Sequence, residues 1–440
     1  MKRTITEKLL KWKDSKRRKP LVISGVRQCG KTYIIKKFGE ENFENIVYLN
    51  FEESEKFGSF FEYDYDVNRI VSEIEEEFSC TISDGKTLLV FDEIQKCSRA
   101  ITSLKYFCEN RRKLHVVCAG SLLGIEMRKE GTSFPVGKVE MLQMYPMSFY
   151  EFAKADGCEK AIEAIGKYAK DREIPDLYAE PLIKRLKTYY LVGGMPEVVA
   201  AWTESHDYNE VTNIQDAILS GYRNDFAKHA PAKDVPKINW IWDALPQQLA
   251  KDNHKFIFSQ VKKGARARDL EDALQWLVDA GLCHKLERVE NPEFPLSYCS
   301  DSTYFKLYAC DVGLLSRLSK LDMKTVLDGT PLFDRFKGAI TENYVMQQFM
   351  EMGYESFFWK SGNIAEVDFL IEYNGEIIPV EVKAADNTRA KSYSMFCRKF
   401  RPKNGFKLSL KNVGKNMTED TETHSLPLYD VFRIGEYIGK

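Results

Sequence analysis

The first 150 residues alternate short apolar runs with stretches of helical periodicity. Five runs predict strands, with helical patterns between most of them: 21–24, 46–51, 87–91, 115–120 and 139–144. The run at 87–91 is continuously apolar, which is typical of a strand buried on both faces of a parallel sheet. The alternation predicts an α/β domain with helices on both faces of the sheet and a ligand at the carboxyl ends of the strands.

Beyond residue 150 the pattern changes twice. A mostly helical stretch predicts a lid or connector, and the order helix, basic turn, helix and strand over 256–290 is that of a winged helix-turn-helix. Asn374-Gly375 then predicts a β-hairpin, which follows a helix expected to begin near residue 338. The predicted domains are an α/β core at 1–150, a helical lid at 151–250, a winged-helix-like segment at 251–330 and an α/β domain at 331–440.

Composition narrows the class of protein only a little. The chain has 440 residues, with 64 Lys and Arg against 65 Asp and Glu, so any surface that binds nucleic acid must be local. None of its ten cysteines forms a C-x-x-C pair, which favours a reducing compartment without structural zinc. No apolar stretch is long enough to span a bilayer, and no signal peptide is evident. We therefore expect a soluble cytoplasmic protein with no membrane partner.

The most specific motif is a glycine loop between the first predicted strand and a helix. It fits G-x-x-x-x-G-K-[ST] at every fixed position: Gly25, Val26, Arg27, Gln28, Cys29, Gly30, Lys31 and Thr32. Such a loop directs backbone N–H groups and a helix N-terminus at one point, which suits a polyphosphate. Lys31 is expected to reach the β- and γ-phosphates, and Thr32 to ligate Mg²⁺. A chance glycine turn before a helix is the alternative.

Acidic and small polar residues follow two later strands of the same domain. Asp92 and Glu93 end the apolar run at 87–91, and we expect Asp92 to hold the Mg²⁺ shell and Glu93 to act as the general base. A simple polar turn is the alternative for this pair. Ser121 follows the strand at 115–120, where it could sense the γ-phosphate or cap the next helix.

A further pair of residues suggests a contact with DNA. Arg266 and Arg268, in the basic turn of the winged-helix pattern, could contact phosphates or base edges of double-stranded DNA. They could equally solvate a surface that packs only against protein.

The C-terminal hairpin carries a possible metal site. Glu381 and Lys383 project from one face of a strand, and Asp368 on the neighbouring strand can come beside them. With Glu342 on the preceding helix, these residues suit Mg²⁺-assisted phosphodiester cleavage. An E-x-K pair alone is common on exposed strands.

Three segments resemble a bacterial and archaeal group of AAA-type P-loop ATPases with a C-terminal domain of unknown function. They are Arg18 to Thr32, Tyr189 to Glu197 and Lys306 to Leu315. The resemblance implies ATP rather than GTP, a winged-helix segment and a C-terminal fold like restriction endonucleases. It also makes residue 138 a candidate sensor of the γ-phosphate. Lys138 stands there, where members of the group commonly carry arginine, and lysine lacks the planar fork of arginine.

Three functions remain open from the sequence. The first is an ATP-binding, ATP-hydrolysing conformational switch associated with DNA, with Mg²⁺ as cofactor. The second is a DNA-binding regulator with little turnover, and the third is an ATP-regulated, metal-dependent nuclease. Glu93, the basic turn and the Asp368 cluster distinguish the three. The sequence leaves a homo-oligomer open.

Overall fold

The computed structural model describes the chain in two compact units. One comprises Lys2–Tyr145 with Asp279–Gly281, and the other comprises Met1, Pro146–Val278 and Leu282–Lys440. The residues described are 1–126, 134–168, 172–251, 255–321, 326, 331–362, 364–384 and 391–439.

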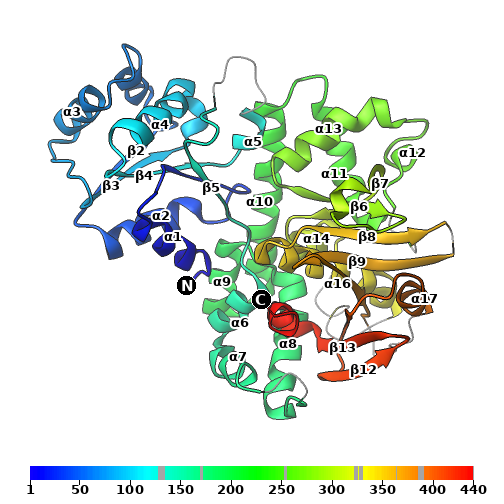
Figure 1. Ribbon diagram of the computed structural model, residues 1–440. Helices are drawn as coiled ribbons and strands as arrows, with labels where there is room; N and C mark the ends of the chain where they lie inside the picture. Colours follow the sequence, from blue (N-terminus) through cyan, green and yellow to red (C-terminus); the bar gives the residue numbers. More distant parts are fainter. Residues whose placement is uncertain are drawn as a thin grey trace. The chain divides into compact units, whose positions relative to one another are not determined.

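The first unit contains a five-stranded parallel sheet with the strand order β2-β3-β4-β1-β5. All five strands predicted from the sequence are confirmed, as β1 (Leu21–Ser24), β2 (Asn45–Asn50), β3 (Thr87–Asp92), β4 (His115–Gly120) and β5 (Glu140–Gln143). Its helices are α1 (Ile5–Asp14), α2 (Lys31–Asn42), α3 (Val67–Phe78), α4 (Ser98–Asn110) and α5 (Leu123–Glu126), with 3₁₀ turns η1 (Glu55–Phe61) and η2 (Ile94–Lys96). The alternating strands and helices are visible in Figure 1.

Side-chain alternation along β3 explains why that strand is apolar throughout. Leu89 and Phe91 belong to the buried cluster formed with α3 and α4. Leu88 faces the other side, where the close approach of Gly39 on α2 to Ile46 and Leu88 leaves no room for a Cβ. Helices therefore cover both faces of the sheet, as the sequence predicted.

The second unit begins with a run of helices, which confirms the mostly helical stretch expected after residue 150. They are α6 (Phe149–Ala153), η3 (Lys154–Cys158), α7 (Glu159–Ile165), α8 (Asp176–Val192), α9 (Pro196–Ser205), α10 (Tyr208–His229) and α11 (Val235–Leu249). Next come α12 (Phe258–Val261) and α13 (Ala267–Asp279), whose last residue belongs to the first unit.

The second unit also contains an eight-stranded mixed sheet with the strand order β12-β13-β11-β10-β9-β8-β6-β7. Its strands are β6 (Cys283–Val289), β7 (Ser300–Ala309), β8 (Ser356–Ser361), β9 (Ala365–Tyr373), β10 (Glu376–Val382), β11 (Asn404–Ser409), β12 (Gly414–Thr418) and β13 (Thr421–Pro427). The remaining elements are α14 (Val312–Leu318), α16 (Pro331–Met352), α17 (Lys391–Phe400), α18 (Ile434–Tyr437) and the turns η4 (Leu296–Tyr298) and η5 (Leu428–Arg433).

The hairpin expected at Asn374-Gly375 is confirmed, since β9 and β10 pair antiparallel across it. The helix expected to begin near residue 338 instead begins at Pro331, so Glu342 lies in its middle rather than in its first turn. β6 pairs in parallel with β8, so strands from both sides of residue 330 belong to one sheet. The sheet does not mark a domain boundary at residue 330, and the boundary expected there stays a prediction.

Candidate functional site: the phosphate loop and its neighbours

The glycine loop joins β1 to α2 and is shaped by two positions where a side chain is excluded. A Cβ on Gly25 would lie 2.2 Å from the carbonyl oxygen of Met144. Gly30 caps α2 in the left-handed conformation at φ 94°, which glycine adopts without a steric penalty. The loop thus needs glycine at both fixed positions of the motif, and α2 begins at Lys31 with its free N–H groups at the loop.

The cation of the loop is turned onto the loop itself. Lys31 is buried, and its Nζ donates to the carbonyl oxygens of Gly25 at 2.8 Å and Val26 at 3.0 Å. A bond from the ammonium group to a charged phosphate oxygen is stronger than a bond to a neutral carbonyl. Lys31 therefore has its cation within the loop that the motif assigns to phosphate.

Thr32 and Asp92 meet although sixty residues separate them. Thr32 Oγ1 donates to Asp92 Oδ2 at 2.7 Å, because β1 and β3 end at the same edge of the sheet. A hydroxyl and a carboxylate held together are ligands of the kind that Mg²⁺ accepts beside a nucleotide. The residues present therefore fit the metal ion that the motif implies.

Tyr48 on β2 is a part of this site that sequence analysis missed. Its hydroxyl donates to Asp92 Oδ2 at 2.5 Å, and the Lys36 ammonium lies 4.0 Å from the centre of its ring. Burial and the bond to Asp92 raise the pKa of Tyr48, so the hydroxyl stays protonated and acts as a donor. β2 runs beside β3, and Asn50 at the end of β2 is level with Asp92. A polar side chain near the end of β2 could therefore have been expected at this site.

Glu93 follows Asp92 in an uncommon backbone conformation. Its φ of 51° and ψ of 40° are left-handed, which costs about 1–2 kcal/mol for a residue with a Cβ. Burial, and the neighbouring Asp92 charge to a lesser degree, raise the pKa of Glu93, whereas a hydrogen bond from Gln95 lowers it. A partly desolvated carboxylate with a raised pKa has the properties of a general base.

The two sensor candidates lie in different places. Ser121 directly follows β4, which lies between β1 and β3, so it stands between the phosphate loop and Asp92 along the sheet edge. Lys138 precedes β5, whose Glu140 is level with Leu21 at the start of β1. It pairs with Glu109 at 2.6 Å at the amino end of the sheet. A role for Lys138 at the phosphates of its own subunit was therefore a wrong prediction, because parallel strands put those two ends at opposite edges.

Arg3 is a second residue that sequence analysis missed. Its guanidinium donates to the carbonyl oxygens of Cys29 at 3.2 Å and Tyr145 at 2.7 Å, which ties the chain before α1 to the loop. Cys29 is itself fully buried. The cluster of basic residues at the N-terminus gave no signal that one of them contacts the loop.

In the second unit, Asp368 and Glu381 come together as expected. The β9–β10 ladder pairs Phe369 with Val380, and Val382 N donates to Asp368 Oδ2 at 2.7 Å. Burial and the charge of Glu381 raise the pKa of Asp368 well above its usual range. Lys383 Nζ pairs with Glu381 Oε1 at 2.6 Å.

Lys306 on β7, which sequence analysis did not single out, places a second cation in this acidic cluster. Its fully buried Nζ lies 3.2 Å from Glu342 Oε2 and 2.7 Å from Glu366 Oε1. Burial alone would lower the pKa of Lys306, but Glu342 and its neighbours raise it, so the side chain is an ammonium ion. Among the described residues no three His, Cys, Asp or Glu side chains are placed to hold a metal ion. Lys306 and Lys383 neutralise part of the carboxylate charge of this cluster.

The basic turn of the winged-helix pattern is at the surface. Arg268 is 77% exposed and lies 3.8 Å from Asp269, whose carboxylate accepts a hydrogen bond from the backbone of Arg266. The turn therefore presents its guanidinium groups to solvent at the start of α13.

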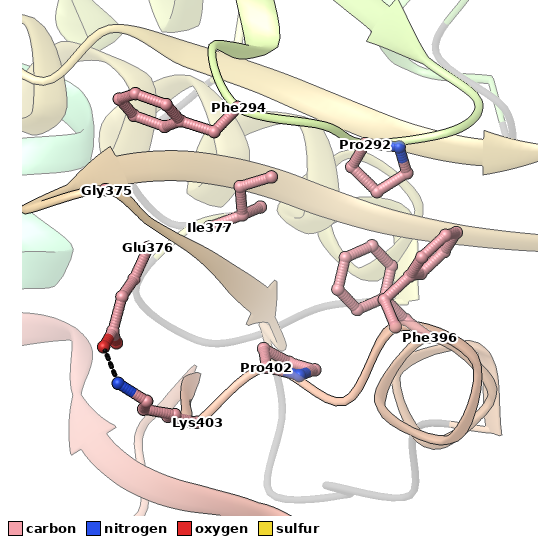
Figure 2. Close-up of a pocket in the computed structure, with 9 residues that line it drawn as sticks. Pro292, Phe294, Gly375, Glu376, Ile377, Phe396, Pro402 and Lys403 are labelled. Atoms are coloured by element: carbon pink, nitrogen blue, oxygen red, sulfur yellow. Dashed lines mark hydrogen bonds and ion pairs between the residues drawn. The ribbon is translucent and has the colours of Figure 1, made fainter.

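A separate hollow of about 240 Å³ lies at the β9–β10 turn and α17. Figure 2 shows aromatic and proline side chains around it, with a rim pair of Glu376 and Lys403 at 2.7 Å. Its lining contains none of the candidate site residues.

The geometry of the first unit is that of a P-loop nucleotide-binding domain. Residues 17–153 match the family model described as an AAA domain, so this part of the chain resembles the AAA-type P-loop ATPases. Two models, each described as a domain of unknown function, match residues 183–325 (DUF8612) and 337–430 (DUF4143). Neither description names a winged helix or an endonuclease.

The solved structures that match this chain do so at low sequence identity. The Walker-type ATPase PABY2304 of Pyrococcus abyssi is 14% identical, with 71% of this chain and 94% of that chain covered and a TM-score of 0.43. The ORC1 protein of Aeropyrum pernix in complex with DNA is 10% identical (72% and 90% covered, TM-score 0.27). The RuvB Holliday junction branch migration motor of Thermotoga maritima is 14% identical (66% and 89%, TM-score 0.28). A comparison with the curated proteins found no match.

Within the described residues, no helix combines the length and the apolarity that crossing a membrane requires.

Proposed function

We propose that this protein binds ATP with Mg²⁺ and hydrolyses it, and that the exchange of ATP for ADP switches its conformation. The observation that carries the proposal is the meeting of Lys31, Thr32, Asp92 and Glu93 at the carboxyl ends of β1 and β3. A cation, two metal ligands and a partly buried carboxylate are the groups that phosphoryl transfer to water needs.

Each residue has a distinct part in this proposal. The backbone N–H groups from Gly25 to Thr32 cradle the phosphates, and Lys31 moves its donors from the loop carbonyls to the phosphate oxygens. Thr32 and Asp92 hold Mg²⁺, which supplies neutralisation of the phosphate charge when it is bound. Glu93 accepts a proton from the attacking water. Ser121 lies where it can contact the γ-phosphate.

A turnover assay tests the proposal. Phosphate release from MgATP by the full chain should exceed that of Lys31→Ala, and ATP should be preferred over GTP. Equal release by the two proteins would contradict the proposal.

Adding duplex DNA distinguishes a DNA-associated ATPase, in which turnover changes, from a regulator that binds DNA with little turnover. The exposed Arg266 and Arg268 support contact with DNA. Light scattering in the presence of ATP or of ADP measures the oligomeric state of the protein.

Metal-dependent cleavage of DNA by the Asp368 cluster is the weaker alternative. The approach of Asp368, Glu381 and Lys383 supports it, and the Lys306 ammonium opposes it. A plasmid nicking assay in Mg²⁺ or Mn²⁺ tests this alternative. Nicking that disappears in Asp368→Asn while ATP binding persists would establish a nuclease. Nicking that survives the substitution would come from a contaminant.

A further inference from the structure

Gln95 is a partly buried residue next to the candidate general base, and one of its two polar side-chain atoms lacks a hydrogen-bond partner among the described residues. Gln95 lies in η2, directly after Glu93, and its Nε2 donates a short hydrogen bond to Glu93 Oε2. Its Oε1 is buried and has no hydrogen-bond partner among the residues that the structure describes. A buried carbonyl oxygen left without a donor destabilises the folded state. Such a cost is expected where a ligand or water completes the site.

The free oxygen of Gln95 lies at the tip of β4. A Cβ built on Gly120 would come within 2.3 Å of it, so the glycine makes room for the amide. Ser121 follows in the chain, and β4 stands between β1, which leads into the phosphate loop, and β3, which carries Asp92. The Gln95 amide therefore spans from the Glu93 carboxylate to the strand tip beside the phosphate loop.

We propose that Gln95 is a positioning residue for ATP hydrolysis, whose N–H holds the Glu93 carboxylate while its Oε1 accepts a hydrogen bond from the attacking water. The inference rests on the proposed ATPase function and adds a residue to it. The water oxygen bonds to the γ-phosphorus, and the bond from that phosphorus to the β–γ bridging oxygen breaks. ADP leaves, and one proton of the water passes to Glu93. Contacts with both Glu93 and Gln95 fix the direction from which the water molecule approaches the γ-phosphorus.

Substitution of Gln95 by methionine, which is of similar length, tests the proposal in the full-length protein. We expect kcat for MgATP to fall about tenfold to a hundredfold, as for loss of one group that orients a proton transfer, with the Kd for ATP within about twofold of wild type. The matched control is Lys96→Met in the same turn, where Lys96 makes only a long, half-exposed pair with Glu52 at 3.9 Å. The control should keep wild-type kcat.

The split between kcat and Kd distinguishes positioning from a merely structural role. Gln95→Glu keeps the length of the side chain but cannot donate a hydrogen bond to the Glu93 carboxylate, so kcat should fall while the Kd for ATP stays near that of the wild type. A merely structural role would change kcat and Kd together. This variant also keeps the test open if Gln95→Met does not fold.

The outcomes separate this inference from the proposed function. If wild type and Lys31→Ala release phosphate equally, the ATPase proposal fails. If wild type turns over, Glu93→Gln does not, and Gln95→Met matches Lys96→Met in kcat and in the Kd for ATP, only the Gln95 inference is overturned. A rise in kcat in Gln95→Met would also overturn it, since the amide would then restrain Glu93 rather than position it.

Discussion

The Lys31 ammonium bonds to two carbonyls of its own loop, so the exchange of these for phosphate oxygens sets its contribution to binding. We expect Lys31→Ala to weaken ATP binding by about 1.5–3 kcal/mol, the usual worth of a hydrogen bond to a charged group. This corresponds to about tenfold to a hundredfold in Kd. Titration with a fluorescent ATP analogue measures it. Lys37→Ala, on the same helix and paired with Glu41 at 3.8 Å, is the control that should bind normally. Wild-type affinity in Lys31→Ala would exclude the phosphate loop as the binding site.

In the proposed mechanism Glu93 acts on the attacking water, whereas Lys31 acts on the phosphates. Glu93→Gln keeps the shape and removes the proton acceptor, so binding should persist and kcat should fall about a hundredfold or more. Single-turnover measurement with excess enzyme separates this step from product release. Unchanged single-turnover rates would place the general base elsewhere in the chain.

At the scale of elements, helix α1 is attached to the sheet through the aromatic contacts of His115. The imidazole on β4 lies 5.6 Å from the Trp12 ring and 4.8 Å from the Phe43 ring. Burial and the nearby Arg18 lower the pKa of His115 to about 4, from about 6.5 in an unfolded chain. The unfolded state therefore binds more protons between these values, and the free energy of unfolding should fall as the pH drops from 6.5 to 4.

Denaturant unfolding of the wild type and His115→Phe at pH 7.5 and pH 4.5 measures this effect. The variant has no imidazole to protonate, so its loss of stability between the two pH values should be smaller than that of the wild type. Equal losses would assign the acid sensitivity to other groups.

The Lys306 ammonium connects β7 to α16 and β9 through two carboxylates. Lys306→Met keeps the volume but leaves the buried Glu342 without this cation, which should destabilise this unit by about 3–5 kcal/mol. Lys360→Met is the control, because Lys360 pairs only with Glu366 at 2.7 Å and is closer to the surface. Chemical denaturation followed by hydrogen exchange in β7 and β9 gives the comparison. A smaller loss for Lys306→Met than for Lys360→Met would contradict this account.

At the scale of the whole molecule, the balanced net charge makes any contact with DNA depend on a local basic surface. If the turn before α13 provides it, Arg266→Gln with Arg268→Gln should weaken binding to all duplex sequences alike. The slope of log K against log salt should become shallower by about two, because two fewer counterions are released. Fluorescence anisotropy across a salt series measures the slope. Curves that superimpose on those of the wild type would make the turn a solvated surface.

Local patterns predicted most of the elements, because each depends on a short stretch of chain. The apolar run of β3, the glycine loop before α2 and the Asn374-Gly375 turn all follow from nearest neighbours in the sequence. The start of α16 was misplaced by several residues, because the prediction did not use Pro331, and proline at the first position of a helix is a start signal.

The sequence by itself determined the phosphate loop, its strand and helix, and the acidic pair that ends β3, because the chemistry of these motifs is contained in adjacent residues. Only the tertiary structure decided which distant residues join them. Tyr48 and Gln95 reach the acidic pair, and Lys306 enters the Asp368 cluster, through strand order and side-chain direction. Strand direction likewise put Lys138 at the edge of the sheet away from the loop. Such contacts depend on the pairing of strands far apart in the chain, which no local pattern encodes.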